Sequence, residues 1–359
     1  MKLNYLQKNL YIFFSITISI LIVTLLWEKI TLPFNNYSDA KGFLVQNQYN
    51  PNNDVLRYIF FITLPLVTFL FIKIFFEKKT INISELLLEK NEKSQGYEST
   101  IMIISLVFVI LIFLEFFSVR FSFSEYNLDQ LHDGNYLTPF QNYLSTKKLW
   151  TSSHLTHGVS DIFYPFITSK VFGVQSIGGT RSFTIFLVLL VKLLSVLLSY
   201  QFTKISKLNK ETKILFFTIF TLILISMSRY TFLGKSYYIS YKDIYIILFL
   251  IFFIELFFNS KLKFISIILI SLIATISILF QIDKGAYINF VLIFYILYLF
   301  GTKKYGDFFL LLVSLSICWL IVINFIGFEE FKAFLNNTIS MASSMDLMTG
   351  LKYPEPFFS

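Results

Sequence analysis

Long apolar runs separated by short polar segments dominate the chain. The hydrocarbon core of a bilayer is about 30 Å thick, and an α-helix crosses it with roughly 20 predominantly apolar residues. Nine runs approach this length: 10–27, 58–76, 99–119, 182–201, 213–229, 243–259, 264–281, 285–300 and 307–326. The pattern therefore predicts an all-α fold, a polytopic transmembrane helical bundle of about nine spans.

The lysines give this bundle an orientation. If the N-terminus is cytoplasmic, every inward connection contains lysine, from Lys78 and Lys79 in the first to Lys303 and Lys304 in the last. Cytoplasmic loops of membrane proteins are enriched in lysine and arginine, which favours this orientation. The large outward connection is then the one from 120 to 181.

Three regions follow from this topology. Residues 1–98 form an N-terminal two-span region with a cytoplasmic linker, and residues 99–326 form a transmembrane core that includes the outer loop 120–181. Residues 327–359 form an outer tail, which stops without another span or a polar ending and is therefore typical of a truncated C-terminus. The N-terminal run lacks a small-residue cleavage site, so we expect it to remain as the first span.

Composition supports a membrane protein and excludes other classes. Hydrophobic residues make up 55% of the chain and charged residues 14%, with a mean hydropathy of +0.68. The formal net charge of +8 does not indicate nucleic-acid binding, because the lysines are spread among short connections and form no single patch. The single cysteine, Cys318, excludes an intramolecular disulfide framework and a multi-cysteine metal site.

The outer loop contains all three histidines of the chain and two amphipathic helix candidates. In the first, Thr138 can cap a helix whose first residue is Pro139. In the second, Asp161 can cap the helix and Gly173 can end it. Because short amphipathic helices tend to lie on the membrane surface, we expect this loop to fold over it.

Candidate chemistry is concentrated in the same loop. Its ionisable residues include Asp129, His132, Asp133, His154, His157 and Asp161. A carboxylate beside the membrane can act as a general base toward an acceptor hydroxyl, which makes Asp133 a candidate, although Asp133-Gly134 is equally typical of a turn. On a helix, His154, His157 and Asp161 would share one side and suit a divalent metal ion. Hydrogen bonding within a folded loop is the alternative.

Four arginines fall at the predicted outer ends of spans: Arg57, Arg120, Arg181 and Arg229. The guanidinium group binds phosphate through two parallel hydrogen bonds, so these residues suggest a phosphate cradle at the outer leaflet. Arg181 and Arg229 adjoin spans that flank the large loop and are its expected members. Anchoring of helix ends to lipid headgroups is the alternative.

Ionisable residues also lie within the predicted spans. Lys192 in the fourth and Glu255 in the sixth differ in depth by roughly 3 Å at 1.5 Å per helical residue. A buried charge in lipid needs a partner, which predicts a structural Lys192–Glu255 pair. Glu115 lies near the outer end of the third span, where it can reach water or the loop.

The run "LHDGNYLTP…KKLW…HGVSDIFYPF…VFG…SIGGTR" resembles bacterial polytopic membrane proteins of the GT-C glycosyltransferase type. In those proteins an acidic residue early in a large outer loop precedes two surface helices. The resemblance implies sugar transfer from a polyprenyl-phosphate carrier, with Asp133 as the general base or acceptor-orienting residue and Asp129 as its substitute. Two features depart from the pattern: Asp133 is followed by Gly134 where many members have a second acidic residue, and the loop follows the third span instead of the first.

We therefore predict a multi-pass enzyme of the bacterial cytoplasmic membrane. It would move a sugar from a polyprenyl-phosphate donor to a cell-envelope glycan or lipid acceptor on the outer face, among membrane lipids and without nucleic acid. The expected substrate-binding residues are His132, His154, His157, Asp161, Arg181 and Arg229. No cofactor is certain, and the loop is compatible with a divalent metal.

Two other functions stay open at this point. An envelope polysaccharide polymerase or a flippase would use similar outer loops and polyprenyl-linked substrates. A secondary transporter without covalent chemistry is less favoured, because transporters place their polar groups near the middle of the membrane and this chain concentrates them outside.

Overall fold

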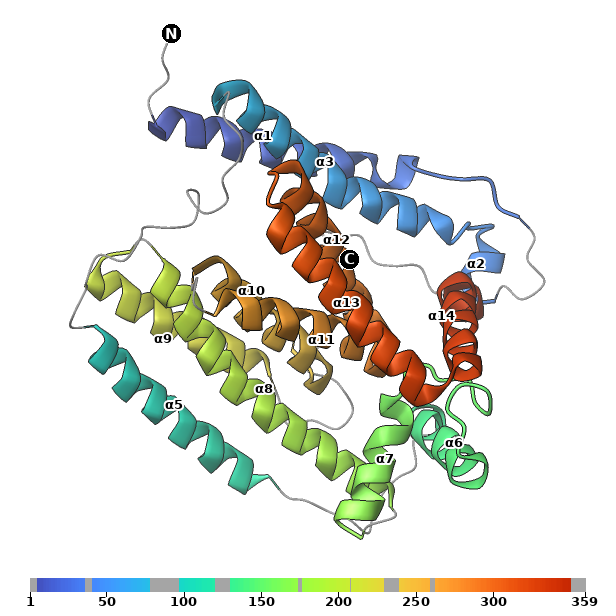
Figure 1. Ribbon diagram of the computed structural model, residues 1–359. Coiled ribbons are helices and arrows are strands. Elements are labelled where there is room, and N and C mark those ends of the chain that lie inside the picture. The colour runs from blue at the N-terminus through green and yellow to red at the C-terminus, as the bar shows by residue number, and fades with distance from the viewer. Residues whose placement is uncertain are drawn as a thin grey trace. The chain divides into compact units, whose positions relative to one another are not determined.

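The computed structural model describes residues 5–35, 41–77, 97–119, 130–173, 176–206, 208–228, 239–258 and 262–349. The fold of these residues is all-α, with one isolated bridge between Ser228 and Ile239 and no strand (Figure 1). The helices are α1 (Tyr5–Leu26), α2 (Phe43–Gln46), α3 (Asn52–Glu77), α5 (Glu98–Ser118), α6 (Gln130–Thr146), α7 (Ser160–Val171), α8 (Ile177–Ile205), α9 (Lys210–Met227), α10 (Ile244–Phe258), α11 (Lys263–Phe280), α12 (Ile282–Gly301), α13 (Tyr305–Ile326) and α14 (Phe328–Thr349), with 3-10 turns η1 (Trp27–Lys29) and η2 (Tyr241–Asp243).

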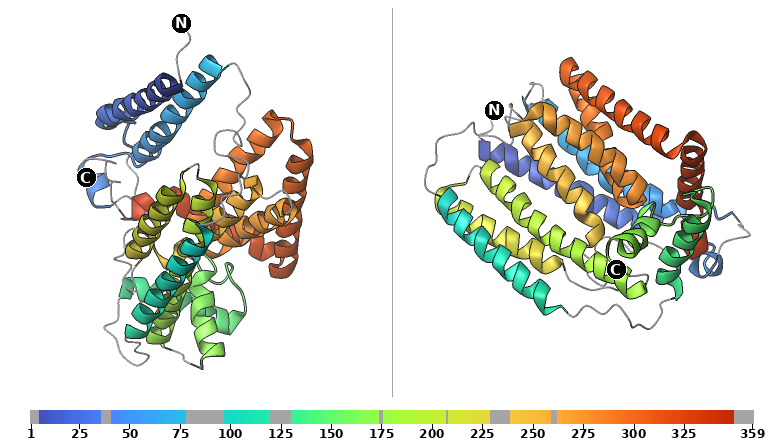
Figure 2. Two further views of the ribbon diagram at one scale, coloured as in Figure 1. Left: turned by 90° about the vertical axis from the view of Figure 1, so that its left-hand side faces the viewer. Right: turned by 60° about the horizontal axis from the view of Figure 1, so that its bottom comes forward.

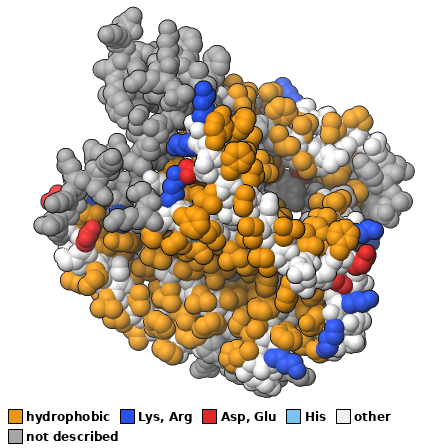
Figure 3. Space-filling model, viewed as in Figure 1, with side chains coloured by type: hydrophobic (Ala, Val, Ile, Leu, Met, Phe, Trp, Pro, Cys, Tyr) orange, Lys and Arg blue, Asp and Glu red, His pale blue; other side chains and the backbone are white. Residues whose placement is uncertain are grey.

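Each of the nine apolar runs is helical over most of its described residues, as the sequence predicts. Among the described residues, five helices are long and apolar enough to cross a bilayer: α5, α8, α11, α12 and α13. Large hydrophobic side chains are exposed on these helices, for example Leu114 and Phe117 of α5 and Leu320 and Phe325 of α13. Figure 3 shows hydrophobic side chains over much of the described surface of these helices. The chain is therefore a membrane protein.

The chain divides into two compact units, residues 1–82 with 338–359 and residues 83–337. In the first unit α1 packs along α3, and Ser19 Oγ donates a hydrogen bond of 2.9 Å to Thr68 Oγ1 between them. Trp27 is fully buried and meets the edges of Tyr58 and Phe61. A hydrogen bond and aromatic packing thus join α1 and α3, which are otherwise mostly apolar.

Arg57 is the centre of the polar segment between α1 and α3. Its side chain is 0% exposed, and its Nε donates to the Ile30 carbonyl at 3.0 Å and its Nη1 to Tyr49 Oη at 2.6 Å. The guanidinium also lies 3.6 Å from Asp54 and 3.5 Å from Glu28. The expectation that Arg57 is available for a phosphate cradle is therefore wrong, because its donors bind this segment.

In the second unit α8 packs against α5 and α9 on one side and against α10 on another, and the right-hand view of Figure 2 shows these helices side by side. Helices α10 to α13 form a core around Ile270, Ile288 and Leu311. The approach of α11 to α12 is close, since a Cβ on Gly285 would lie 2.1 Å from the Ile278 Cα. Helices α6 and α7 lie where α11 ends and α12 begins.

The expected Lys192–Glu255 pair does not form. Lys192 binds Glu115 of α5, and Glu255 accepts a hydrogen bond of 2.7 Å from Gln201. Gln201 lies nine residues beyond Lys192 on α8, or about 14 Å at the rise of a helix. The sequence-based depths assumed that the fourth and sixth spans begin at one level, which would put Glu255 within roughly 3 Å of the depth of Lys192, whereas Glu255 meets α8 about 14 Å beyond Lys192.

Candidate functional site

The segment between α6 and α7 is fastened to the break between α11 and α12. The Val159 N–H donates to the Leu279 carbonyl at 2.8 Å, and the Ile282 N–H donates to the His157 carbonyl at 2.9 Å. Between these bonds Gly158 has φ of +113°, and a Cβ there would lie 2.4 Å from the Leu279 oxygen. Only glycine fits this close approach without strain.

His157 and Asp161 form the acid–base pair of this segment. One oxygen of Asp161 lies 2.9 Å from His157 Nδ1, and the other accepts the His157 backbone N–H at 2.9 Å. The carboxylate is 0% exposed and the imidazole 25% exposed. Because a carboxylate accepts hydrogen bonds, Nδ1 of the neutral ring carries the hydrogen and Nε2 has a lone pair. This is the arrangement of an oriented general base.

His154, His157 and Asp161 do not share a helical face, and His157 forms hydrogen bonds within the folded loop, which is the alternative interpretation of these residues. Helix α7 begins at Ser160, and the residues before it follow an irregular path through Gly158. His154 is exposed and takes no part in the pair. His157 and Asp161 meet instead because the Asp161 carboxylate turns back from the first turn of α7. The expectation that Asp161 caps this helix is wrong, because Val159 is at the cap position and no side chain caps the helix.

Three tyrosines surround the pair. Tyr136 of α6 stacks on the His157 ring at 6.3 Å, and its hydroxyl lies 2.8 Å from that of Tyr241. Tyr164 of α7 meets Tyr241 edge to face at 6.0 Å. Burial raises the pKa of both Tyr164 and Tyr241 well above its usual value, so these phenols stay neutral hydrogen-bonding groups.

A charged cluster adjoins the tyrosines from η2 and the start of α12. Lys284 Nζ lies 3.1 Å from Asp243 and 3.8 Å from Asp283. Asp243 also closes a capping box with Ser240, whose backbone N–H it accepts at 2.6 Å. Burial lowers the pKa of Lys242, while Asp283 and then Asp161 act in the opposite direction.

These charged residues were missed in the sequence interpretation. Two signals were present: "SYKD" at 240–243 is a capping-box pattern, and "IDK" at 282–284 is the tight connection between two apolar runs. Neither signal says that the two connections meet at His157. The contact depends on how α10 and α12 pack.

Helix α6 differs from its prediction. It begins at Gln130, so Pro139 lies inside it and Thr138 is not its cap. A proline removes one helical hydrogen bond, but the turn before it is held by the contacts of Tyr136 with His157 and with Tyr241 of η2. Asp133 and Gly134 are therefore helical, and the turn interpretation of this dipeptide is wrong. Gly173, with φ of +67°, does follow the end of α7 as predicted.

Most of the other predicted site residues have side chains outside the described part of the structure. Asp129 and Arg229 lie outside the described residues, as does Arg120. His132 and Asp133 belong to the first turn of α6, and their side chains are likewise outside the described part. Arg181 is buried near the start of α8. Asp133 precedes Tyr136 by three residues, which places both positions on one side of the helix.

An apolar cavity of ≈ 510 Å³ is lined in part by the segment that carries His157 and Asp161. Val159 and Ile162, at the start of α7, form one wall of this cavity, and Leu272 of α11 and Val322 of α13 contribute to other walls. Val159 lies two residues from both His157 and Asp161. A polar acid–base pair and an apolar cavity thus share one short segment, which suits an amphiphile with a polar head and an apolar tail.

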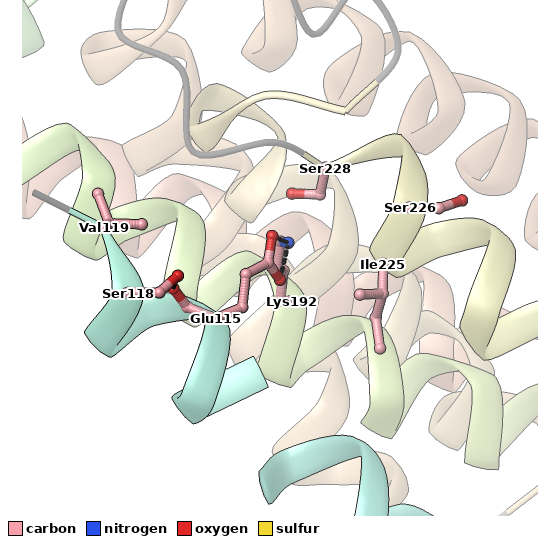
Figure 4. Close-up of a pocket in the computed structure, with 7 residues that line it drawn as sticks. All are labelled: Glu115, Ser118, Val119, Lys192, Ile225, Ser226 and Ser228. Atoms are coloured by element: carbon pink, nitrogen blue, oxygen red, sulfur yellow. Dashed lines mark hydrogen bonds and ion pairs between the residues drawn. The ribbon is translucent and has the colours of Figure 1, made fainter. Parts of the chain in front are cut away.

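A second, more polar cavity of ≈ 450 Å³ lies between α5, α8 and the end of α9 (Figure 4). Lys192 Nζ donates to both Glu115 carboxylate oxygens at 2.7 and 2.6 Å, and Figure 4 shows this pair at the centre of the lining residues. Ser118, Ser226 and Ser228 add three hydroxyls.

The described side chains offer no ready metal site, and comparison with known proteins does not assign the chain to a family. No group of three or more His, Cys, Asp or Glu residues in this part of the chain is placed to hold a metal ion. His157 and Asp161 alone would leave most of a coordination sphere to other ligands. Comparison with protein-family models, curated proteins and solved structures finds no match to the chain.

Proposed function

We propose that this protein is a polytopic membrane glycosyltransferase that moves a sugar from a polyprenyl-phosphate carrier to a glycan or lipid acceptor of the bacterial cell envelope. The observation that carries the proposal is the segment 157–161. It joins an oriented histidine–aspartate pair to the wall of an apolar cavity. A lipid-linked sugar has this same division, with a phosphate and a sugar at one end of an isoprenoid chain.

The proposed reaction assigns the base to His157. The acceptor hydroxyl gives its proton to Nε2, and the hydroxyl oxygen attacks the anomeric carbon of the donor sugar. The bond from that carbon to the phosphate oxygen breaks, and its electron pair leaves with the phosphate. Asp161 keeps the imidazole oriented and stabilises the imidazolium that forms.

The cluster at η2 and α12 supports the leaving group in this proposal. Lys242, which interacts electrostatically with Asp161, and Lys284, which pairs with Asp243, contribute two ammonium groups, and charge that develops on a departing phosphate is stabilised by such fixed cations. Asp243 and Asp283 balance the charge of the two lysines, so these four residues carry no net charge. In this proposal the donor phosphate therefore binds the ammonium groups in competition with the two carboxylates.

The resemblance of the loop to GT-C enzymes keeps Asp133 as a second candidate base. Its position on the Tyr136 side of α6 is compatible with a role at the same site. Asp129, His132, Arg181 and Arg229 remain proposed substrate-binding or substitute residues on the same grounds. The proposal also includes nine spans, a cytoplasmic N-terminus and α6 and α7 as surface helices on the outer side.

Transfer by the purified protein in proteoliposomes, with a panel of labelled polyprenyl-phosphate sugars, tests the proposal. We expect one donor to be turned over, and His157→Gln and Asp133→Asn to identify the base by which of them abolishes transfer. Donor binding, measured in parallel, should survive the change that removes the base. Turnover only with carriers of preassembled repeat units would instead assign a polymerase, and parental rates in both variants would overturn the proposed site.

A further inference from the structure

The cavity around Glu115 and Lys192 has no role in the reaction proposed above. It lies on the α5 and α9 side of α8, whereas η2 packs on α8 from the α10 side. We infer that this cavity binds the neutral, hydroxyl-rich headgroup of a membrane amphiphile, a glycosyl or similar polyol group. The inference does not depend on the proposed function, because binding there requires no sugar transfer.

The polar groups of the cavity are mostly acceptors. Ser118 Oγ donates to the Glu115 carbonyl at 2.6 Å and Ser226 Oγ to the Ile223 carbonyl at 2.9 Å, so their hydrogens are used within the helices. Their oxygens still accept. The Glu115 side chain is 46% exposed, and its two oxygens have lone pairs beyond those that bind Lys192.

Ser228 is the least explained member of the lining. Its residue is 1% exposed, and its hydroxyl has no hydrogen-bond partner among the described residues. A buried hydroxyl without a partner destabilises the fold, because it has lost its hydrogen bonds to water. Figure 4 shows the Ser228 side chain on the side of the cavity occupied by Glu115 and Lys192. A bound ligand group would give this hydroxyl its partner.

Charge selects the ligand class. The Lys192 ammonium bound to both oxygens of Glu115 already balances the carboxylate. A phosphate would bring acceptor oxygens and negative charge to a cavity rich in acceptors, and an amine would bring positive charge beside Lys192. Sugar hydroxyls donate to carboxylate and seryl oxygens without adding charge, so the neutral polyol fits best.

The surroundings of the cavity indicate that the ligand carries an apolar chain. Leu114 and Phe117 precede the lining residues Glu115 and Ser118 on α5, Leu222 lies one turn before Ser226 on α9, and all three side chains are exposed. The volume of ≈ 450 Å³ lies within the range of about 300 to 1,000 Å³ typical of small-molecule sites. A headgroup in the cavity would leave its chain along α5 and α9.

Saturation-transfer NMR on the full-length protein in a detergent without sugar tests the inference. The probes share one chain and differ in the headgroup: hexyl β-D-glucoside, hexyl phosphate, hexylamine and hexanol. We expect the glucoside to bind most tightly, Glu115→Gln to weaken it at least about tenfold and Ser228→Ala about fivefold, as losses of a charged and a neutral hydrogen bond. Glu255→Gln and Ser271→Ala are matched controls, because the half-buried Glu255 and the buried Ser271 do not line the cavity.

Other outcomes overturn the inference. Equal saturation of all four probes would show binding through the chain alone, and tighter binding of the phosphate or the amine would assign a charged ligand. Ser228→Ala keeps the test decisive if Glu115→Gln fails to fold, since it leaves the ion pair intact.

Glucoside binding that survives Asp161→Asn, while sugar transfer is lost, separates this cavity from the proposed catalytic site.

Discussion

Asp161 holds His157 at two points, the ring Nδ1 and the backbone N–H, each at 2.9 Å. The first contact sets the tautomer of the ring and the second sets the path of the segment that carries it. Because the carboxylate is fully buried, neither contact competes with water. The pair is therefore both a structural element of the loop and a candidate for acid–base chemistry.

Asp161→Asn separates these two roles. The amide oxygen of asparagine can still accept the His157 backbone N–H, but its NH₂ would face Nδ1 and favour the tautomer with hydrogen on Nε2. We expect a folded protein whose sugar transfer falls by about two to four orders of magnitude, with donor binding little changed. Single-turnover transfer and donor binding measured together check this, and a parental transfer rate would contradict it.

The sequence predicted the helices well and the site in part. Apolar runs identify membrane helices because lipid offers the backbone no other hydrogen-bond partners, and all nine runs are helical over most of their described residues. His157 and Asp161 were both among the expected residues, but on a helical face that Gly158 interrupts. The residues of η2 and α12 were missed because only the packing of distant connections brings them to the segment that contains His157. The position of α10 along α8 was missed because hydropathy identifies a span but does not determine its depth relative to another span.

Gly158 predicts a sharp stability effect. In Gly158→Ala the new Cβ would lie 2.4 Å from the Leu279 carbonyl oxygen in a backbone with φ of +113°, so the segment must move. We expect a loss of about 1 to 3 kcal/mol, seen as a lower thermal unfolding temperature in detergent, together with reduced transfer. Gly134→Ala is the matched control, because nothing lies within 4 Å of its Cβ position and alanine favours the helix. Equal effects of the two changes would contradict the docking of this segment.

Lys242 predicts a pH dependence. Burial lowers its pKa, so the ammonium loses its proton at a lower pH than a free lysine as pH rises. If the ammonium binds the donor phosphate, donor affinity should decline on the alkaline side below the ordinary lysine pKa of about 10.4. In Lys242→Arg the decline should disappear, because guanidinium stays charged there. Donor binding measured across this pH range checks both statements, and an unchanged profile in the variant would exclude Lys242 as the titrating group.

The proposed topology predicts which connections react from outside the cell. After Cys318→Ser, single cysteines introduced in 140–160 should react with an impermeant thiol reagent in intact cells. Cysteines in 202–210 should react only after permeabilisation. The reverse pattern would place α6 and α7 in the cytoplasm and remove the outer-face interpretation of the site.

The arginines give a paired test of phosphate binding. Arg57→Lys removes the planar guanidinium group that binds Ile30 and Tyr49 in the polar segment between α1 and α3. The stability of the protein should therefore fall while donor affinity stays the same. In Arg181→Lys we expect the opposite, a loss of donor affinity on the order of tenfold if the guanidinium binds the carrier phosphate through two bonds. Thermal unfolding and binding of polyprenyl phosphate, measured on both variants, separate the outcomes. Unchanged affinity in Arg181→Lys would reduce this residue to a helix-end anchor, and the lysines of η2 and α12 would then be the only described cations left to hold the phosphate in the proposed site.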